Sequence, residues 1–204
     1  MVDNLFNIRD NISYENESGC IMRVITGIAR GKRLKTLEGQ DVRPTTEKVK
    51  ESVFNIIQFD VEGRAFLDLF AGCGQMGIEA LSRGAKNAVF VDNRRESISV
   101  IKANLSNTGL TDKAKVLNTD SLAFIAREQA EKFDLAFLDP PYGTGILQKA
   151  LPLTALQMKK SGIIICERPS NEEIPEKIHG FVLDRNYRYG KIVVSTYRYE
   201  DVTD

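Results

Sequence analysis

The sequence predicts an α/β domain with a mostly parallel seven-stranded sheet that ends in an antiparallel C-terminal strand. Three observations support this. From residue 64 onward, strand-like apolar runs alternate with amphipathic helical segments. Such alternation implies right-handed crossovers and therefore parallel strands covered by helices on both faces. The last two apolar runs flank Gly190 without room for a helix between them, so they should form an antiparallel hairpin.

The bulk composition fits one domain of this kind. A chain of 204 residues can bury a proper core, and its 42% hydrophobic and 27% charged residues are ordinary for a globular protein. No apolar run approaches the roughly 18 residues of a membrane span, and no signal peptide opens the chain. We therefore expect a cytoplasmic protein without membrane contacts. Three scattered cysteines and one histidine argue against a disulfide framework or a zinc site, so no metal is expected.

The chain divides into three parts. Residues 1–21 lack a sustained period and are rich in Asn, Ser and Glu, which predicts a disordered tail before Met22. Residues 22–43 form a basic extension, whose apolar runs should pair as a hairpin around Gly31. Although the net charge of the whole chain is zero, residues 22–50 carry eight basic side chains against three acidic ones. Residues 44–204 form the main domain.

The main domain should begin with an amphipathic helix that follows Pro44. The strands of the parallel part are expected at 64–70, 87–93, 114–120, 133–139 and 162–167. The helices between them are expected at 76–83, 94–108, 121–131 and 146–158, with Pro152 disturbing the last. A further short helix near 172–179 should precede the final hairpin.

A glycine loop connects the first strand of the sheet to the next helix. Its glycines have the spacing GxGxxG, and Asp92 ends the following strand. Glycines allow a tight turn and a close approach of the backbone to a ligand, while the acid can accept hydrogen bonds from ribose hydroxyls. The pattern therefore predicts a cofactor that contains adenosine. Cys73 lies within this loop, but no histidine lies near it in sequence, so we do not expect a nucleophile.

Strand-end carboxylates favour S-adenosylmethionine over NAD(P). Acids stand at the ends of four successive strands, at the edge where open α/β sheets bind ligands: Asp68, Asp92, Asp120 and Asp139. A pyrophosphate disfavours nearby carboxylates, whereas a sulfonium and an ammonium group attract them. The expected cofactor-binding residues are Asp68, Phe70, Gly72, Gly74, Gly77, Asp92, Asn93, Asp120 and Ser121.

The strand at 133–139 ends in the sequence Asp139-Pro140-Pro141-Tyr142. Proline cannot continue a ladder, so the strand must stop there and present its tip to something other than a neighbouring strand.

These motifs together resemble the class I, Rossmann-like methyltransferases, in which DPPY is similar to the fourth motif of enzymes that methylate exocyclic or amide nitrogens. That resemblance implies that Asp139, Pro140, Pro141 and Tyr142 are the catalytic group. The Asp139 carboxylate and the Pro140 carbonyl would accept the two hydrogens of a planar amine, and Tyr142 would offer a face for the base.

Residues 22–57 and the run FLDLFAGCGQMGIEALSRGA resemble the RsmD family more closely. That resemblance implies methylation of the exocyclic N2 of guanine 966 in 16S rRNA, as naked RNA or in a small-subunit particle, by a monomer. It also implies that Thr45 and Thr46 approach the active site and that RNA is bound by Arg23, Arg30, Lys32, Arg33, Lys35 and Arg43.

Four alternatives remain open at this point. A DNA adenine-N6 methyltransferase shares DPPY but usually needs a target-recognition region, for which this chain has little room. A protein glutamine-N5 methyltransferase would need no basic hairpin. An NAD(P)-dependent oxidoreductase leaves DPPY unexplained, and a non-catalytic RNA-binding module leaves the glycine loop unexplained.

Overall fold

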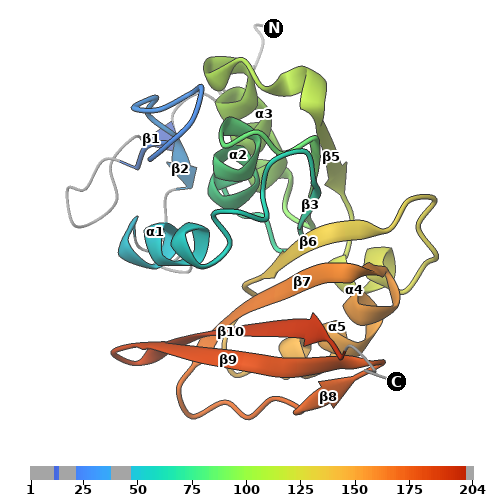
Figure 1. Cartoon of the computed structure of the whole chain (residues 1–204). Coiled ribbons are helices and arrows are strands. Elements are labelled where there is room, and N and C mark those ends of the chain that lie inside the picture. The colour runs from blue at the N-terminus through green and yellow to red at the C-terminus, as the bar shows by residue number, and fades with distance from the viewer. Residues whose placement is uncertain (1–11, 14–21, 38–46, 201–204) are drawn as a thin grey trace, which may run out of the picture.

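The structure is a computed structural model that describes residues 12–13, 22–37 and 47–200, and it contains one large sheet (Figure 1). The parallel strands in this sheet are β3 (Ala65–Asp68), β4 (Asn87–Asp92), β5 (Ala114–Asn118), β6 (Phe133–Leu138) and β7 (Met158–Pro169). The remaining strands are β8 (Lys177–Ile178), β9 (Phe181–Tyr189) and β10 (Ile192–Tyr199).

The strand order across the sheet is β5-β4-β3-β6-β7-β10-β9-β8. The five neighbouring strands β5, β4, β3, β6 and β7 are parallel to one another. Strand β10 runs antiparallel to both β7 and β9. This confirms the predicted mostly parallel sheet with an antiparallel C-terminal strand. The two-residue β8, which pairs with the start of β9, adds an eighth strand to the seven expected.

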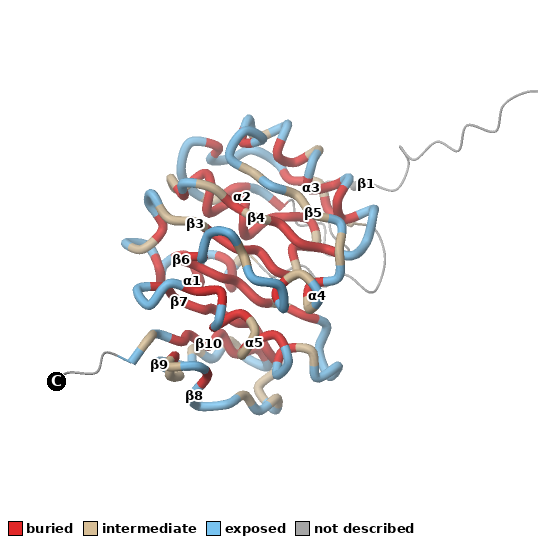
Figure 2. The backbone as a smooth tube through the Cα atoms, turned by 90° about the vertical axis from the view of Figure 1, so that its right-hand side faces the viewer, coloured by how far each residue is buried: buried red, intermediate tan, exposed pale blue. Residues whose placement is uncertain are grey.

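Helices cover both faces of the sheet and enclose two hydrophobic clusters. One face is covered by α1 (Glu47–Ile56), α2 (Gln75–Ser82) and α3 (Arg95–Thr108), which pack against apolar side chains of β3, β4 and β6. The other face is covered by α4 (Ser121–Ile125) and α5 (Ile146–Leu156). Figure 2 shows the buried strands running through the middle of the molecule between these layers. Within the ranges described above, no helix is both long and apolar enough to span a bilayer.

Two predicted helices differ from the structure. The helix expected at 121–131 ends at Ile125, its last buried residue, because Arg127 to Lys132 offer no large apolar side chain to pack. The helix expected near 172–179 does not form. Pro175 cannot donate a helical hydrogen bond, and the following residues pair with β9 as β8 instead. Pro152 is accommodated inside α5.

The N-terminal extension forms a compact hairpin over residues 22–37. Arg23 and Arg33 make an antiparallel bridge, and the Val24 N–H donates to the Lys32 carbonyl at 3.0 Å. Farther along, β2 (Thr36–Leu37) pairs with β1 (Ile12–Ser13), which is the one part of the predicted tail that the structure describes. Predictions for the rest of that tail, and for Arg43, Thr45 and Thr46, lie outside the described residues.

Candidate active site

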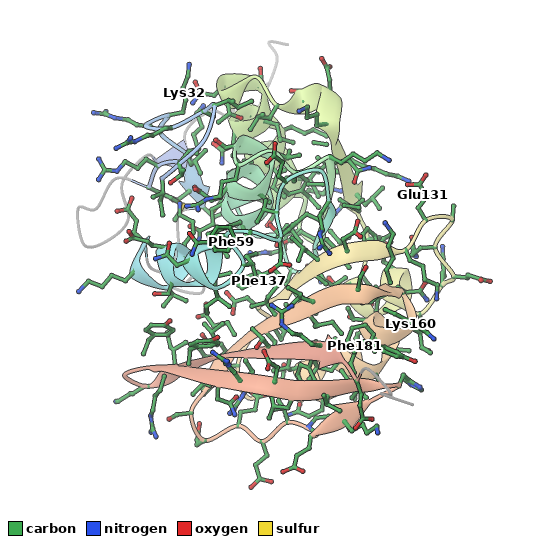
Figure 3. The ribbon with its side chains drawn as sticks, in the orientation of Figure 1. Lys32, Phe59, Glu131, Phe137, Lys160 and Phe181 are labelled. Atoms are coloured by element: carbon green, nitrogen blue, oxygen red, sulfur yellow. The ribbon has the colours of Figure 1, made fainter. Side chains whose placement is uncertain are left out.

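The predicted site lies where the strand order reverses. β3 stands between β4 and β6, and ligands of open α/β sheets bind in the crevice outside the carboxyl ends at such a point. Figure 3 shows Phe137, near the carboxyl end of β6, toward the α1 side of the molecule, whereas Glu131 and Lys160 lie on the opposite side. The strand order brings the four strand-end acids to neighbouring positions along this edge. Their spatial order is Asp120, Asp92, Asp68 and Asp139.

The glycine loop is held by the acid at the end of β4. The Gly72 N–H donates to Asp92 Oδ2 at 2.9 Å, and the Arg94 N–H donates to Asp92 Oδ1 at 2.9 Å. Each carboxylate oxygen has a second lone pair, so Asp92 can still accept from ribose hydroxyls. At Gly77, a Cβ atom would lie 2.3 Å from the Phe90 ring. The third glycine of the motif is therefore required for close packing of α2 on β4.

Asp68, at the end of β3, is almost completely buried. Its Oδ2 accepts a hydrogen bond from the Gly77 N–H at 2.9 Å and so fixes the first turn of α2. Burial raises the pKa of this carboxyl to about 7, and the charge of Asp92 adds to that rise, whereas the Gly77 hydrogen bond opposes it. A cationic ligand near Asp68 would favour the ionised carboxylate.

The remaining predicted cofactor residues line the neighbouring strand ends. Asp120 caps α4 by accepting from the Ala123 N–H at 2.7 Å, and the Ser121 hydroxyl donates to the Leu69 carbonyl at 2.6 Å. Phe70 is half-buried against the hydrophobic cluster on the α4 and α5 face of the sheet, and Asn93 is exposed. Ser121 therefore ties the start of α4 to the loop that follows β3.

Cys73 is buried within the glycine loop and has a structural role. Its thiol donates to the Met22 sulfur at 3.6 Å. Burial raises the pKa of this thiol to about 11, so the nucleophilic thiolate is disfavoured near neutral pH. This agrees with the expectation that Cys73 is not a nucleophile.

The Asp139-Pro140-Pro141-Tyr142 segment follows β6 directly. Asp139 is half-buried, Pro140 is buried, and Pro141 and Tyr142 are exposed at the edge. The Tyr142 hydroxyl donates to Glu167 Oε1 at 2.6 Å. This hydrogen bond orients the tyrosine ring against the neighbouring strand β7.

Glu167 was missed in the sequence analysis. It is a buried acid near the carboxyl end of β7, the strand next to β6. The pattern that predicted the other four acids, an acid at the end of an apolar strand-like run, also holds here, since Glu167 follows the run GIIIC. A fifth strand-end carboxylate therefore belongs to this edge.

The arrangement fits a cationic cofactor better than a dinucleotide. The N–H groups of Gly72 and Gly77, which a pyrophosphate would need, already donate to the carboxylates of Asp92 and Asp68. Asp92 provides negative charge for a sulfonium or an ammonium group, and such a cation would favour the ionised form of Asp68 as well. In the described part of the chain, no cluster of His, Cys, Asp and Glu side chains is suited to a metal ion.

The N-terminal hairpin is fixed to α2 by a buried carboxylate. The N–H groups of Ile25 and Thr26 donate to the two oxygens of Glu79 at 2.8 and 2.9 Å, and Arg83 Nε donates to the same carboxylate at 2.8 Å. Lys50 of α1 is fully buried 4.0 Å from Glu79 and donates to the Arg23 carbonyl at 2.6 Å. Burial lowers the pKa of Lys50, although the charge of Glu79 opposes this. Neither Glu79 nor Lys50 was predicted as a key residue.

The outer side of the hairpin carries the predicted RNA-binding cations. Arg30, Lys32 and Arg33 are exposed, and Lys35 is half-buried. Arg23 lies 3.6 Å from Glu47 of α1, so part of its charge is balanced within the protein. Between the hairpin and α1 lies a pocket of about 300 Å³, lined by Arg23, Val24, Ile25, Arg30, Gly31, Glu47 and Glu51.

Comparisons with known proteins agree with this arrangement. The family described as "Conserved hypothetical protein 95" matches residues 22–198. The Bacillus subtilis protein named "Putative rRNA methyltransferase YlbH" is 40% identical over 87% of this chain and 98% of its own length. "Ribosomal RNA small subunit methyltransferase D" of Haemophilus influenzae is 32% identical over 82% of this chain and 93% of its own length.

A solved structure supports the same assignment. "Putative methyltransferase yhhF" of Escherichia coli superimposes with a TM-score of 0.76, is 29% identical, and covers 88% of this chain and 98% of its own chain. The family match spans the basic hairpin, the glycine loop and the DPPY segment. The chain thus belongs to the RsmD family of S-adenosylmethionine-dependent methyltransferases.

Proposed function

We propose that the protein transfers a methyl group from S-adenosylmethionine to the exocyclic N2 of a guanine in 16S rRNA, at position 966, of the small ribosomal subunit. The observation that carries this proposal is the DPPY segment at the carboxyl end of β6, beside the glycine loop at the end of β3. Family membership and the names of the relatives support rRNA as the substrate class. Such a substrate implies that the protein acts in the cytoplasm, and we expect it to act as a monomer.

The carboxylates of the crevice would hold the cofactor. Asp92 would accept from ribose hydroxyls, and Asp68, whose ionised form a bound cation would favour, would then add negative charge beneath the glycine loop. The cofactor, once bound, supplies an activated methyl group that a nitrogen nucleophile can attack. The residues of this chain therefore need only position that nitrogen and remove its surplus proton.

The DPPY segment would position the guanine. A guanine N2 is a weak nucleophile because its lone pair is delocalised into the ring, so orientation provides much of the rate. Asp139 and the Pro140 carbonyl accept the two amine hydrogens, and the prolines keep that carbonyl rigid. Tyr142 stacks on the base, with its ring held by Glu167. The surplus proton leaves to Asp139 or to water after the N–C bond forms.

An amine within a duplex cannot reach such a clamp, so the target guanine must be unpaired or rotated out of its helix. The exposed cations of the N-terminal hairpin, Arg30, Lys32 and Arg33, are suited to phosphates around the target. These contacts position the RNA without reading its sequence. Recognition of the one guanine would then depend on the shape of the rRNA around it.

The test is Asp139→Ala, assayed by transfer of tritiated methyl groups to small subunits from cells that lack the enzyme. Turnover should fall by about 10³-fold, since amine orientation and proton acceptance are lost together. Binding of adenosylhomocysteine, measured by calorimetry, should stay within about threefold of wild type. Asp112→Ala, at an exposed position on the 3₁₀ turn Thr111–Lys113, is the matched control. Substantial residual turnover in Asp139→Ala would contradict the clamp.

The product identifies the substrate class. Digestion of the methylated rRNA and mass spectrometry of its nucleosides should give N2-methylguanosine, and mass spectrometry of ribonuclease fragments should place the methyl group on the fragment that contains position 966. Another methylated nucleoside, or label found in protein or DNA, would overturn the guanine-N2 proposal while leaving the methyltransferase assignment intact.

A further inference from the structure

We propose that the turn between β9 and β10 is a second RNA-contact surface, which binds unpaired nucleotides next to the target guanine. We call it the tyrosine platform and define it as Arg185, Tyr187, Arg188, Tyr189 and Lys191. The inference rests on the proposed function and extends it by adding a second place at which the RNA is bound.

The register of the sheet places the platform at the edge that carries the DPPY segment. Ile192, the first residue of β10, pairs with Pro169, the last residue of β7. Strand β7 is parallel to β6, and Cys166 pairs with Leu138, the residue before Asp139. The β9–β10 turn therefore projects past the carboxyl ends of β6 and β7. Figure 1 shows this turn extending outward on the same side of the molecule as α1.

The two tyrosines share a face of the sheet with the residue that orients Tyr142. Val194 pairs with Glu167 on one side and with Tyr187 on the other, so these three side chains form one row across the sheet. Neighbouring strands are about 4.8 Å apart, so the Cα atoms of Tyr187 and Glu167, which are two strands apart, are separated by about 10 Å. Tyr189 lies in the next row toward the edge, opposite Ile192. A base stacked on the platform would therefore be one or two nucleotides away from a guanine on Tyr142.

The exposure of the tyrosines suits stacking. Tyr187 and Tyr189 are half-buried and pack against the same hydrophobic cluster as Val194. Such rings are held by the core on one side and remain accessible on another. Every base has a π-face, so an aromatic platform binds single-stranded RNA with little sequence preference.

The charges of the platform are complementary to RNA. Arg185, Arg188 and Lys191 are exposed, and residues 185–191 include no acid. The adjacent Asp184 lies 3.5 Å from Arg198, which offsets its charge. Arg185 pairs with Thr196 and so lies on the face that carries the two tyrosines, whereas Arg188 pairs with Val193 and lies on the opposite face of the same turn. Aromatic rings and cations gathered at one turn suit unpaired nucleic acid, which is bound through both bases and phosphates.

The platform and the N-terminal hairpin lie on opposite sides of the clamp. The hairpin packs on α2 and α3, where the Lys35 N–H donates to Asn104 at 2.7 Å, whereas β9 and β10 lie beyond β7 at the other end of the sheet. RNA held at both places would be supported on either side of the target guanine. One cationic surface alone would leave one flank of an unpaired loop without contacts.

A single-tryptophan reporter tests the stacking, because the chain contains no tryptophan. The probe is a 16S rRNA stem-loop that contains guanine 966. In Tyr189→Trp, saturating RNA should at least halve the fluorescence through stacking on the indole. The matched control is Tyr199→Trp, at the opposite end of the same hairpin, where Tyr199 pairs with Phe181. Its fluorescence should change by less than a tenth.

Kinetics test the contribution of the platform to the reaction. Tyr187→Ala combined with Tyr189→Ala should raise the KM for unmodified small subunits about tenfold and leave kcat within twofold. Arg188→Ala combined with Lys191→Ala should flatten the slope of log affinity against log salt by about 1.4, as expected for two lost phosphate contacts. Lys86→Ala, exposed at the other edge of the sheet, should change neither value.

All variants must retain wild-type adenosylhomocysteine binding and thermal unfolding, so that a misfolded sheet is not read as lost RNA contact. Wild-type turnover with unaltered KM, salt slope and fluorescence in the variants would overturn the platform and leave the proposed function standing. Absence of methylation of small subunits by the wild-type protein would overturn both.

Discussion

The protein presents two cationic hairpins that are attached to the same sheet in different ways. The N-terminal hairpin, residues 22–37, is fixed by hydrogen bonds from its backbone to side chains of α2 and α3, chiefly to Glu79. The β9–β10 hairpin is fixed by continuous backbone pairing, with Ile192 to Arg198 of β10 paired to both β7 and β9. One attachment is concentrated in a few buried polar groups, and the other is spread along two ladders.

This difference determines how strongly a single substitution destabilises each hairpin. A ladder loses little when one side chain changes, because its hydrogen bonds belong to the backbone. A buried carboxylate that accepts from two backbone N–H groups, and that lies beside a buried lysine, cannot be removed without leaving several groups unpaired. The N-terminal hairpin should therefore be the more sensitive of the two to single substitutions.

The largest effect is expected for Glu79→Ala. It leaves Lys50 as a buried cation without its opposite charge, and leaves the N–H groups of Ile25 and Thr26 without an acceptor. We expect the free energy of unfolding to fall by about 3–5 kcal/mol, measured by urea denaturation. Hydrogen exchange should accelerate in residues 22–37 before it does in β9 and β10. Glu131→Ala, at an exposed position, should change stability by less than about 0.5 kcal/mol.

An intermediate effect is expected from the titration of Asp68, which holds the helix that anchors the N-terminal hairpin. Burial raises its folded-state pKa to about 7, whereas the unfolded chain has a value near the usual 3.9. Between these values the folded chain keeps a proton that the unfolded chain has released. The contribution of Asp68 to the free energy of unfolding is therefore largest at low pH, falls as pH rises toward 7, and levels off above that value.

Comparison with Asp68→Asn isolates this contribution, because the amide does not titrate and its oxygen can still accept from Gly77. The unfolding free energy of wild type minus that of the variant should fall by about 2 kcal/mol between pH 5 and pH 8. A difference that is flat or that increases with pH would mean that burial does not hold a proton on Asp68.

The smallest effect concerns the turns, where the two hairpins are alike. Gly31 has φ +80° and Gly190 has φ +62°, and a Cβ at either position would meet open space. Alanine is strained in this left-handed region but makes no clash, so Gly31→Ala and Gly190→Ala should each cost about 1 kcal/mol. Equal costs would show that the hairpins differ in their anchors alone. A cost above about 3 kcal/mol for either one would reveal a contact beyond the turn.

Local sequence patterns predicted the parts of the protein that repeat or that carry known chemistry. The alternation of strands and helices gave the sheet, because each βαβ unit is encoded within a few tens of residues. The acids at strand ends could be placed on one edge for the same reason. Glu167, which follows the apolar run GIIIC, fits the same rule although it was not predicted.

Contacts between distant segments could not be predicted in the same way. Lys50 sits beside Val49 on the buried face of α1, where a lysine is normally unexpected, and its partner Glu79 lies on another helix. No local pattern links these two residues. The helix expected near 172–179 does not form for a related reason, since pairing of β8 with β9 outweighs a weak local preference for helix.

The attachment of the N-terminal hairpin has a consequence for synthesis of the chain. The hydrogen bonds from Ile25 and Thr26 to Glu79 span 54 and 53 residues. At about 5–20 residues per second, the hairpin leaves the translating ribosome several seconds before the helix that receives it. During that interval the N–H groups of Ile25 and Thr26 have no acceptor on Glu79, and the basic hairpin stays tethered to the RNA-rich ribosome.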